Sequence, residues 1–157
     1  MADDIQINID TSQFETKLKA LPAAVANRYL RTALQAAGDV VLAPMKQLAP
    51  ERTDETTPDE NSLPPGILRE DLSTQVTLGA NGAKVKVGPT AVAGHVCRWQ
   101  NNGWMLTSHG GKKIKQIPGK HFMEAAFDEA AEAAVEALVN SLAESLNTDS
   151  TDSEETL

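Results

Sequence analysis

Three histidines and a single cysteine are the residues of this sequence with the widest chemical repertoire. His95, His109 and His121 lie 14 and 12 residues apart, and Cys97 is the only cysteine. Protein metal sites usually draw three or four His, Cys or carboxylate ligands from closely spaced pairs. The histidines are too widely spaced for such a motif, so we expect no bound metal and no cofactor.

A nucleophilic site is equally poorly supported by the residues. No signature of a cysteine hydrolase surrounds Cys97, and a lone cysteine in a strand is usually a small core residue. Ser108 and His109 are adjacent in the chain, whereas a catalytic triad is defined in space. The Gly110-Gly111-Lys112-Lys113 run lacks the strand and the further glycines of a phosphate-binding loop. We therefore predict no catalytic residues, and a reducing compartment is the simplest interpretation of one cysteine.

Charge is separated along the chain. The 157 residues carry a net charge of −8, yet residues 61–123 hold eight bases and two acids, and residues 124–157 hold ten acids and no base. The middle block is therefore +6 and the last block −10. Such separation indicates that different faces meet different partners.

These two blocks contain the candidate contact residues. The basic ones are Lys112, Lys113, Lys115 and Lys120, and the acidic ones are Glu124, Asp128, Glu132 and Glu136. The acids recur every four residues of a predicted helix with no interleaved base, so they form a ridge of weakly repelling charges. One interpretation is a solvated face. The others are a ridge that meets a basic surface of another subunit, or one that faces a channel for DNA.

Two other functions remain open at this point. Trp99 and Trp104 lie near the basic residues, and nucleic acid bases stack on aromatic side chains. A DNA-binding accessory protein that uses the basic block 61–123 is therefore the alternative function. A small hydrolase would require Cys97 and two histidines to converge. No apolar run approaches the roughly 20 residues of a membrane span, so we expect no membrane partner.

Two long helices are predicted to carry most of the core. The first begins near Pro22, and its apolar residues recur at steps of three and four, which is typical of one buried helical face. That face is predicted to hold Leu30, Leu34, Ala37, Val41, Met45 and Leu48. The second helix runs from about Lys120 to Leu146. Its buried stripe is predicted to hold Phe127, Ala131, Ala134, Val135, Leu138 and Leu142.

An antiparallel hairpin is predicted over about 74–88. Asn81-Gly82 stands between two alternating runs and is the preferred two-residue type I′ turn. Folding there pairs Leu78 with Val85 and places the apolar side chains of both strands on one face.

The remaining segments complete a single α+β domain over residues 1–146. A strand is predicted at about 94–100, and Ile5–Asp10 alternates as a half-buried strand does. Residues 50–66 read as an acidic loop, and residues 100–120 as a basic, glycine-rich loop. The small antiparallel sheet packs against the long N-terminal and C-terminal helices, and residues 147–157 form a disordered acidic tail.

The order of motifs resembles the minor tail component, or tail-completion, family of long-tailed bacteriophages. Gly66-Ile67-Leu68-Arg69 follows an Ala-Pro helix end, a strand ends in Gly88-Pro89, and Trp99 and Gly103 flank a turn. Pro118 and Phe122 then lead into the final helix. The resemblance covers residues 12 to about 146, and it assigns family motif positions to Gly66, Leu68, Arg69, Gly88, Pro89, Trp99, Gly103, Pro118 and Phe122.

The resemblance implies a structural role in the virion neck or tail. Such proteins form hexameric rings that complete the tail and join it to the head connector, and DNA passes through the lumen. The implied partners are further copies of the chain, the connector or stopper, and the tail-tube or terminator proteins. The implied location is the virion, with the host cytoplasm during assembly. A subunit's basic loop lies against its neighbour's acidic helix, or the acidic surface lines the tunnel.

Overall fold

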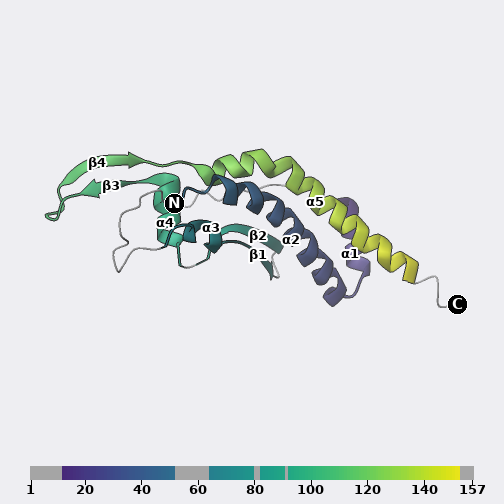
Figure 1. The fold of residues 1–157 in the computed structure, drawn as a ribbon. Helices are drawn as coiled ribbons and strands as arrows, with labels where there is room; N and C mark the ends of the chain where they lie inside the picture. The colour runs from purple at the N-terminus through teal and green to yellow at the C-terminus, as the bar shows by residue number, and fades with distance from the viewer. Residues whose placement is uncertain (1–11, 52–63, 80–81, 91, 153–157) are drawn as a thin grey trace.

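The computed structural model describes residues 12–51, 64–79, 82–90 and 92–152, and it confirms an α+β fold (Figure 1). The predicted strand Ile5–Asp10 and most of the predicted acidic loop lie outside these residues. Nine elements follow one another along the described chain. They are α1 (Ser12–Ala20), α2 (Ala23–Leu48), α3 (Ile67–Asp71), β1 (Leu72–Gly79), β2 (Gly82–Pro89), α4 (Gly94–Asn102), β3 (Gly103–Thr107), β4 (Lys113–Pro118) and α5 (Phe122–Asp152).

Helices α2 and α5 run antiparallel along each other and form the core of the body (Figure 1). Each buries a ridge of residues spaced by four. In α2 and just beyond it the ridge is Tyr29, Ala33, Ala37, Val41, Met45 and Ala49; in α5 it is Phe122, Ala126, Ala130, Ala134, Leu138, Leu142 and Leu146. Ridges at four-residue spacing interlock between packed helices, and the alanines let the two backbones approach closely.

The predicted helical faces are correct in their centres and wrong at their edges. Ala37, Val41 and Met45 are buried as predicted, whereas the predicted core residue Leu48 is 43% exposed and Ala49 takes its place in the ridge. In α5, Phe127, Ala131 and Val135 are half-buried at the flank of the ridge. The prediction mixed steps of three and four, while the observed ridge keeps to steps of four.

The β1–β2 hairpin packs on α2, and its register differs from the predicted one. Leu78 pairs with Ala83 and Val76 with Val85, so only residues 80–81, outside the described set, connect the strands. Gly82 begins β2 with φ of 125°, a conformation that favours glycine. The glycine is therefore the first residue of the strand and not the second residue of the turn. The shift is by two residues, and the same side chains therefore stay on each face.

The predicted strand at 94–100 is wrong, because these residues belong to helix α4. The His95–Trp99 segment has a strand-like composition. Tertiary packing favours the helix, since Ala93, Cys97 and Asn101 are buried at four-residue spacing.

The predicted basic loop at 100–120 is also wrong, because most of it forms the antiparallel pair β3–β4. Gly111, with φ of 76°, closes the turn through a hydrogen bond from its N–H to the Ser108 carbonyl oxygen, 2.8 Å away. The prediction weighed the glycines and lysines and overlooked the apolar residues between them. Helix α5 likewise continues to Asp152, so the predicted disorder from 147 is wrong up to that residue.

Gly38 in the middle of α2 explains how the hairpin approaches the helix. A Cβ atom there would lie 2.7 Å from Val85 Cγ2 and would also overlap the Thr74 methyl group. Both neighbours are β-branched, so their side chains have little freedom to move aside.

We predict that Gly38→Ala destabilises the protein, although alanine favours a helix over glycine by about 1 kcal/mol. The clash with Thr74 and Val85 should outweigh that gain and lower the free energy of unfolding in urea. Gly110→Ala, where an added Cβ meets nothing within 4 Å, is the control and should leave stability nearly unchanged. A Gly38→Ala protein more stable than the parent would contradict the close packing.

Candidate assembly surfaces

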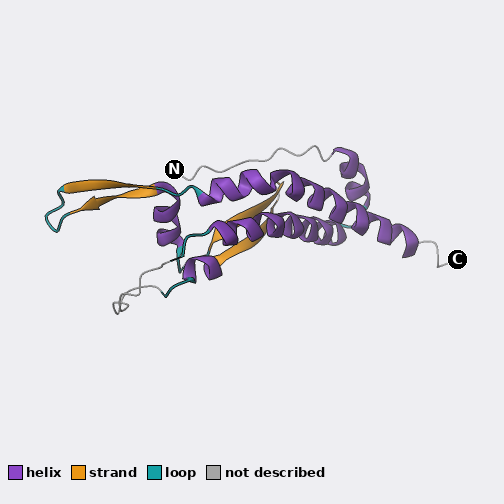
Figure 2. Cartoon of the chain, turned by 45° about the horizontal axis from the view of Figure 1, so that its top comes forward, coloured by secondary structure: helices purple, strands orange, loops and turns teal. Residues whose placement is uncertain are grey.

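The β3–β4 hairpin, which we call the arm (residues 103–118), projects from the helical body (Figures 1 and 2). Apart from its own strand pairing, it contacts mainly α4. Its large apolar side chains are unusually open: Ile114 is 61%, Leu106 43% and Met105 39% exposed. A two-stranded hairpin is marginally stable by itself in water. The arm therefore has the character of a segment that is completed by a partner.

Strand β4 of the arm carries two lysines, Lys113 and Lys115. The strands pair Leu106 with Lys115 and Thr107 with Lys113, with an irregularity between the two pairs. Cross-strand partners point to the same face, and successive residues of a strand point to opposite faces. Lys115 therefore shares a face with its partner Leu106, and Lys113, two positions away on the same strand, lies beyond the irregularity.

Two glycines fix the base of the arm. A Cβ on Gly119 would overlap the Asn101 carbonyl oxygen, and a Cβ on Gly103 would overlap the Ile117 carbonyl oxygen. The backbones in this region also exchange hydrogen bonds, with the Lys120 N–H 2.8 Å from the Gln100 carbonyl oxygen. The segment that enters the arm and the segment that leaves it are therefore in direct backbone contact.

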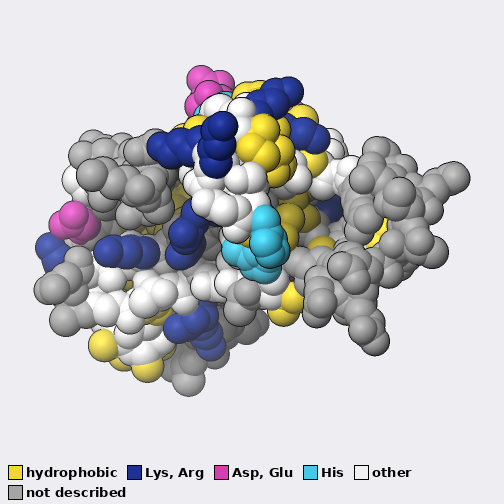
Figure 3. Space-filling model, turned by 90° about the vertical axis from the view of Figure 1, so that its left-hand side faces the viewer, with side chains coloured by type: hydrophobic (Ala, Val, Ile, Leu, Met, Phe, Trp, Pro, Cys, Tyr) yellow, Lys and Arg dark blue, Asp and Glu magenta, His cyan; other side chains and the backbone are white. Residues whose placement is uncertain are grey.

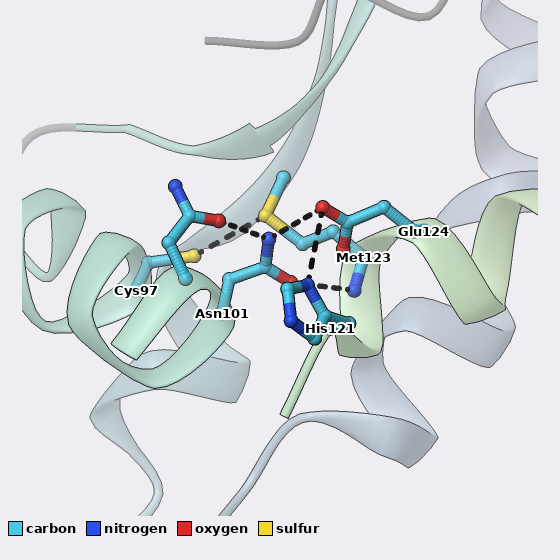
Figure 4. Close-up of polar contacts among 6 residues, drawn as sticks. Cys97, Asn101, His121, Met123 and Glu124 are labelled. Carbon is cyan, nitrogen blue, oxygen red and sulfur yellow. Dashed lines mark hydrogen bonds and ion pairs between the residues drawn. The ribbon is translucent and has the colours of Figure 1, made fainter. Parts of the chain in front are cut away.

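Asn101 joins the base of the arm to the start of α5 (Figure 4). It is only 5% exposed. Its Oδ1 accepts a hydrogen bond from the Met123 N–H at 3.0 Å, and its Nδ2 donates to Glu124 Oε1 at 2.9 Å and to Asn102 Oδ1 at 2.8 Å. The first N–H groups of a helix need such acceptors from outside the helix. Asn101 therefore acts as the N-terminal cap of α5, supplied from α4.

Sequence reasoning missed Asn101, although a signal was present. The residues before α5 are Pro118-Gly119-Lys120-His121, which include none of the usual capping residues Ser, Thr, Asp or Asn. His121, directly before the helix, has a positive φ of 48°. A helix start without a local cap requires an acceptor from elsewhere in the fold.

Cys97 is a core residue beside this cluster. Burial first, and then the charges of Asp71 and Glu124, raise the pKa of its thiol to about 11. The thiol is therefore protonated at neutral pH and donates a weak hydrogen bond to Met123 Sδ, 3.6 Å away (Figure 4). A protonated, buried thiol is a poor nucleophile.

The histidines do not gather into a site. His121 Nδ1 lies 3.8 Å from Glu124 Oε1, and His95 packs edge-on against the Trp99 ring at 5.2 Å between centroids. Across the described parts of the chain, no three His, Cys, Asp or Glu side chains come together in a way that could hold a metal ion.

Asp71 organises the start of α4 in the same manner as Asn101 organises α5. Its carboxylate accepts hydrogen bonds from the Thr90 hydroxyl group and from the Ala93 N–H, the latter at 2.9 Å. The Thr90 hydroxyl, followed by the Ala93 N–H, lowers the pKa of Asp71. This second cap from outside the helix was also missed, because α4 was not predicted.

The predicted acidic face divides into two parts. Glu124 is half-buried and holds Asn101, whereas Asp128, Glu132 and Glu136, which we call the acidic ridge, are exposed. Each ridge residue follows a buried residue of α5 by two positions, or about 200° around the helix, so the ridge faces away from the core. Within the described chain, no ion pair engages these three acids.

The predicted basic residues are exposed at the end of the molecule that the arm forms. Lys112, Lys113, Lys115 and Lys120 all have open side chains. In the view onto this end, lysine and arginine side chains outnumber acidic ones (Figure 3). No ion pair among the described residues involves these four lysines.

Most motif positions lie in the core or at the ends of helices and strands. Arg69 Nε donates to the Lys46 carbonyl oxygen at 2.9 Å and so holds the end of α2, and Gly66 begins α3 with φ of 83°. Leu68 and Phe122 are buried, Gly88 faces Met123, and Pro89 and Pro118 end their strands. Trp99 differs, because it is 50% exposed next to the arm.

Comparison with known proteins gives one finding. The family profile described as "Bacteriophage HK97-gp10, putative tail-component" matches residues 12–103. No curated protein and no solved structure matches the chain. The matched segment ends where the arm begins. None of the described helices combines the length and the apolarity required to cross a bilayer.

We predict that Asn101→Ala lowers the free energy of unfolding by about 1–3 kcal/mol, since it leaves the Met123 N–H and Glu124 without their buried partner. Asn140→Ala, on the exposed side of α5, is the control. Asn101→Asp retains the acceptor but faces Glu124 with a second carboxylate, so its stability should rise as the pH falls. Denaturant titrations at neutral and acidic pH measure these effects, and equal stability of all variants would refute the capping role.

We also predict an acid-dependent contribution from Asp71. Its pKa is lower in the folded state than in the unfolded chain, so its stabilisation is complete above the unfolded value near 4 and is lost as the pH falls through the folded value. Asp71→Asn should therefore reduce stability at pH 7 and show a smaller further loss on acidification. Glu70→Gln, at the exposed neighbouring position, is the control. An acid dependence unchanged by Asp71→Asn would contradict this role.

Proposed function

Because the chain belongs to the bacteriophage HK97-gp10-like family of tail components, we propose that it is a structural protein that assembles into a ring at the head-proximal end of the tail. In this role it completes the tail and joins it to the head connector. The DNA passes through the lumen without sequence-specific contacts. The protein acts in the virion, after assembly in the host cytoplasm.

The observation that carries this proposal is the exposed arm. The arm exposes the side chains of Ile114, Leu106 and Met105. Its lysines form no ion pair within the described part of the subunit. Both properties suit a protein that functions inside an assembly. Contiguous apolar side chains at a surface commonly mark a protein interaction site. Together with the family membership, this supports contacts with further copies of the chain and with connector and tail proteins.

A catalytic role has no support in the described site. The Cys97 thiol is buried and protonated at neutral pH, and neither His95 nor His121 makes a described contact with it. We therefore assign the protein a role that depends on binding surfaces alone.

The basic end of the molecule favours one alternative, an accessory protein that binds DNA directly. Exposed lysines lie on that end (Figure 3), and Trp99 is half-exposed in α4, the helix directly before the arm. Counterion release would make such binding fall steeply with salt concentration. Binding of the purified protein to duplex DNA with a steep salt dependence would favour the alternative, and no binding at low salt would exclude it.

The decisive experiment is electron microscopy of particles made by a phage that lacks this gene. We expect full heads and separate, unjoined tails, and joined particles again when the gene is supplied from a plasmid. Complete, infectious particles in the absence of the gene would refute a required role in the tail.

A further inference from the structure

We propose that the arm of one subunit binds across the acidic ridge of a second copy of the same chain. This inference rests on the ring assembly proposed above and identifies the surfaces that form it. The arm supplies Lys113 and Lys115 together with its exposed aliphatic side chains, and the ridge supplies Asp128, Glu132 and Glu136.

The charges of the two surfaces are complementary and are not neutralised within the subunit. Residues 103–120 contain four lysines and no acid, and α5 contains acids and no base. In the described chain, no ion pair connects the arm to α5. No ion pair among the described residues includes the four lysines of residues 103–120 or the three acids of the ridge. The arm therefore presents positive charge and the ridge presents negative charge, so the two surfaces are electrostatically complementary.

The arm cannot reach the ridge of its own subunit. It leaves the body at the N-terminal end of α5 and points away from that helix, while the ridge lies farther along it in the opposite direction (Figure 1). The backbone contacts at Gly103 and Gly119, and the hydrogen bonds of Asn101, fix the base from which the arm projects. A contact between arm and ridge must therefore join two chains.

Such a contact uses two different patches of the chain, so it can be made head to tail, as a heterologous contact. Heterologous contacts repeat from one subunit to the next and close into a ring when the rotation between neighbours allows it. A symmetric dimer would instead use the contact twice, with each arm on the ridge of the other subunit, and would leave no arm free for a third copy. Because a ring is the assembly proposed above, we infer the head-to-tail form of the contact.

The surface around the ridge also suits the apolar part of the arm. Ala125 and Ala133 are exposed on α5 among the acids, and their small side chains permit a close approach. Leu106 of the neighbouring arm, which shares a face with Lys115, can then lose contact with water while the lysines meet carboxylates.

Charge reversal tests the interface. In a phage that lacks the gene, plasmids supply Lys113→Glu/Lys115→Glu, Glu132→Lys/Glu136→Lys, or all four substitutions in one chain. Like charges placed opposite each other should lower the yield of infectious particles at least about tenfold for each reversal alone. The fourfold variant restores opposite charges, so it should recover particles, as should co-expression of the two reversed chains.

Lys84→Glu/Lys86→Glu is the matched control for the arm, because it reverses two exposed lysines of β2, outside the arm. Circular dichroism of each purified variant checks folding, and co-expression decides the result if the fourfold variant does not fold. Folded reversed chains that each support normal yields, or that show no mutual rescue, would overturn the interface. Ridge-reversed chains that form joined particles and fail only in holding or passing DNA would instead place the ridge at the lumen and also overturn it. Normal particles without any copy of the gene would refute the proposed function itself.

Discussion

The structure depends on the hydrogen bonds through which Asn101 starts α5. One buried amide satisfies the Met123 N–H and Glu124 in the first turn of the longest helix. The same short segment contacts the chain that leaves the arm, where glycine at 103 and 119 permits backbone contact. The start of α5 and the base of the arm are therefore one structural unit, and neither can move without the other. Asp71, the last residue of α3, performs the equivalent task for α4, so caps supplied by other elements link α3 to α4 and α4 to α5.

A division between body and projecting surfaces follows from this arrangement. The body is held by two alanine-rich ridges at four-residue spacing and by the close contact of the hairpin with Gly38. The family match covers α1 to α4, whereas the arm and the acidic ridge lie beyond it. The match therefore includes one of the two long packed helices, α2, and leaves its partner α5 outside.

The parts of the fold that sequence could predict are those determined by local periodicity. Both long helices, the existence of the β1–β2 hairpin and the exposure of Asp128, Glu132 and Glu136 follow from residue spacing. The failures occur where tertiary contacts override local composition. Residues 94–102 have the composition of a strand, yet burial of Cys97 and Asn101 at helical spacing favours a helix. The glycines and lysines of residues 103–118 favour a loop locally and conceal two short strands.

The sequence alone determined the separation of charge, the wide spacing of the three histidines and the two amphipathic helices, because composition and periodicity are properties of the chain itself. Only the tertiary structure decided that Glu124 leaves the acidic face to bind Asn101, that the lysines lie on a projecting hairpin, and that the arm points away from its own acidic ridge. These outcomes depend on contacts between residues more than 20 positions apart, such as Asn101 with Glu124. Such contacts are hydrogen bonds from α4 to the start of α5, which no local pattern in the chain encodes.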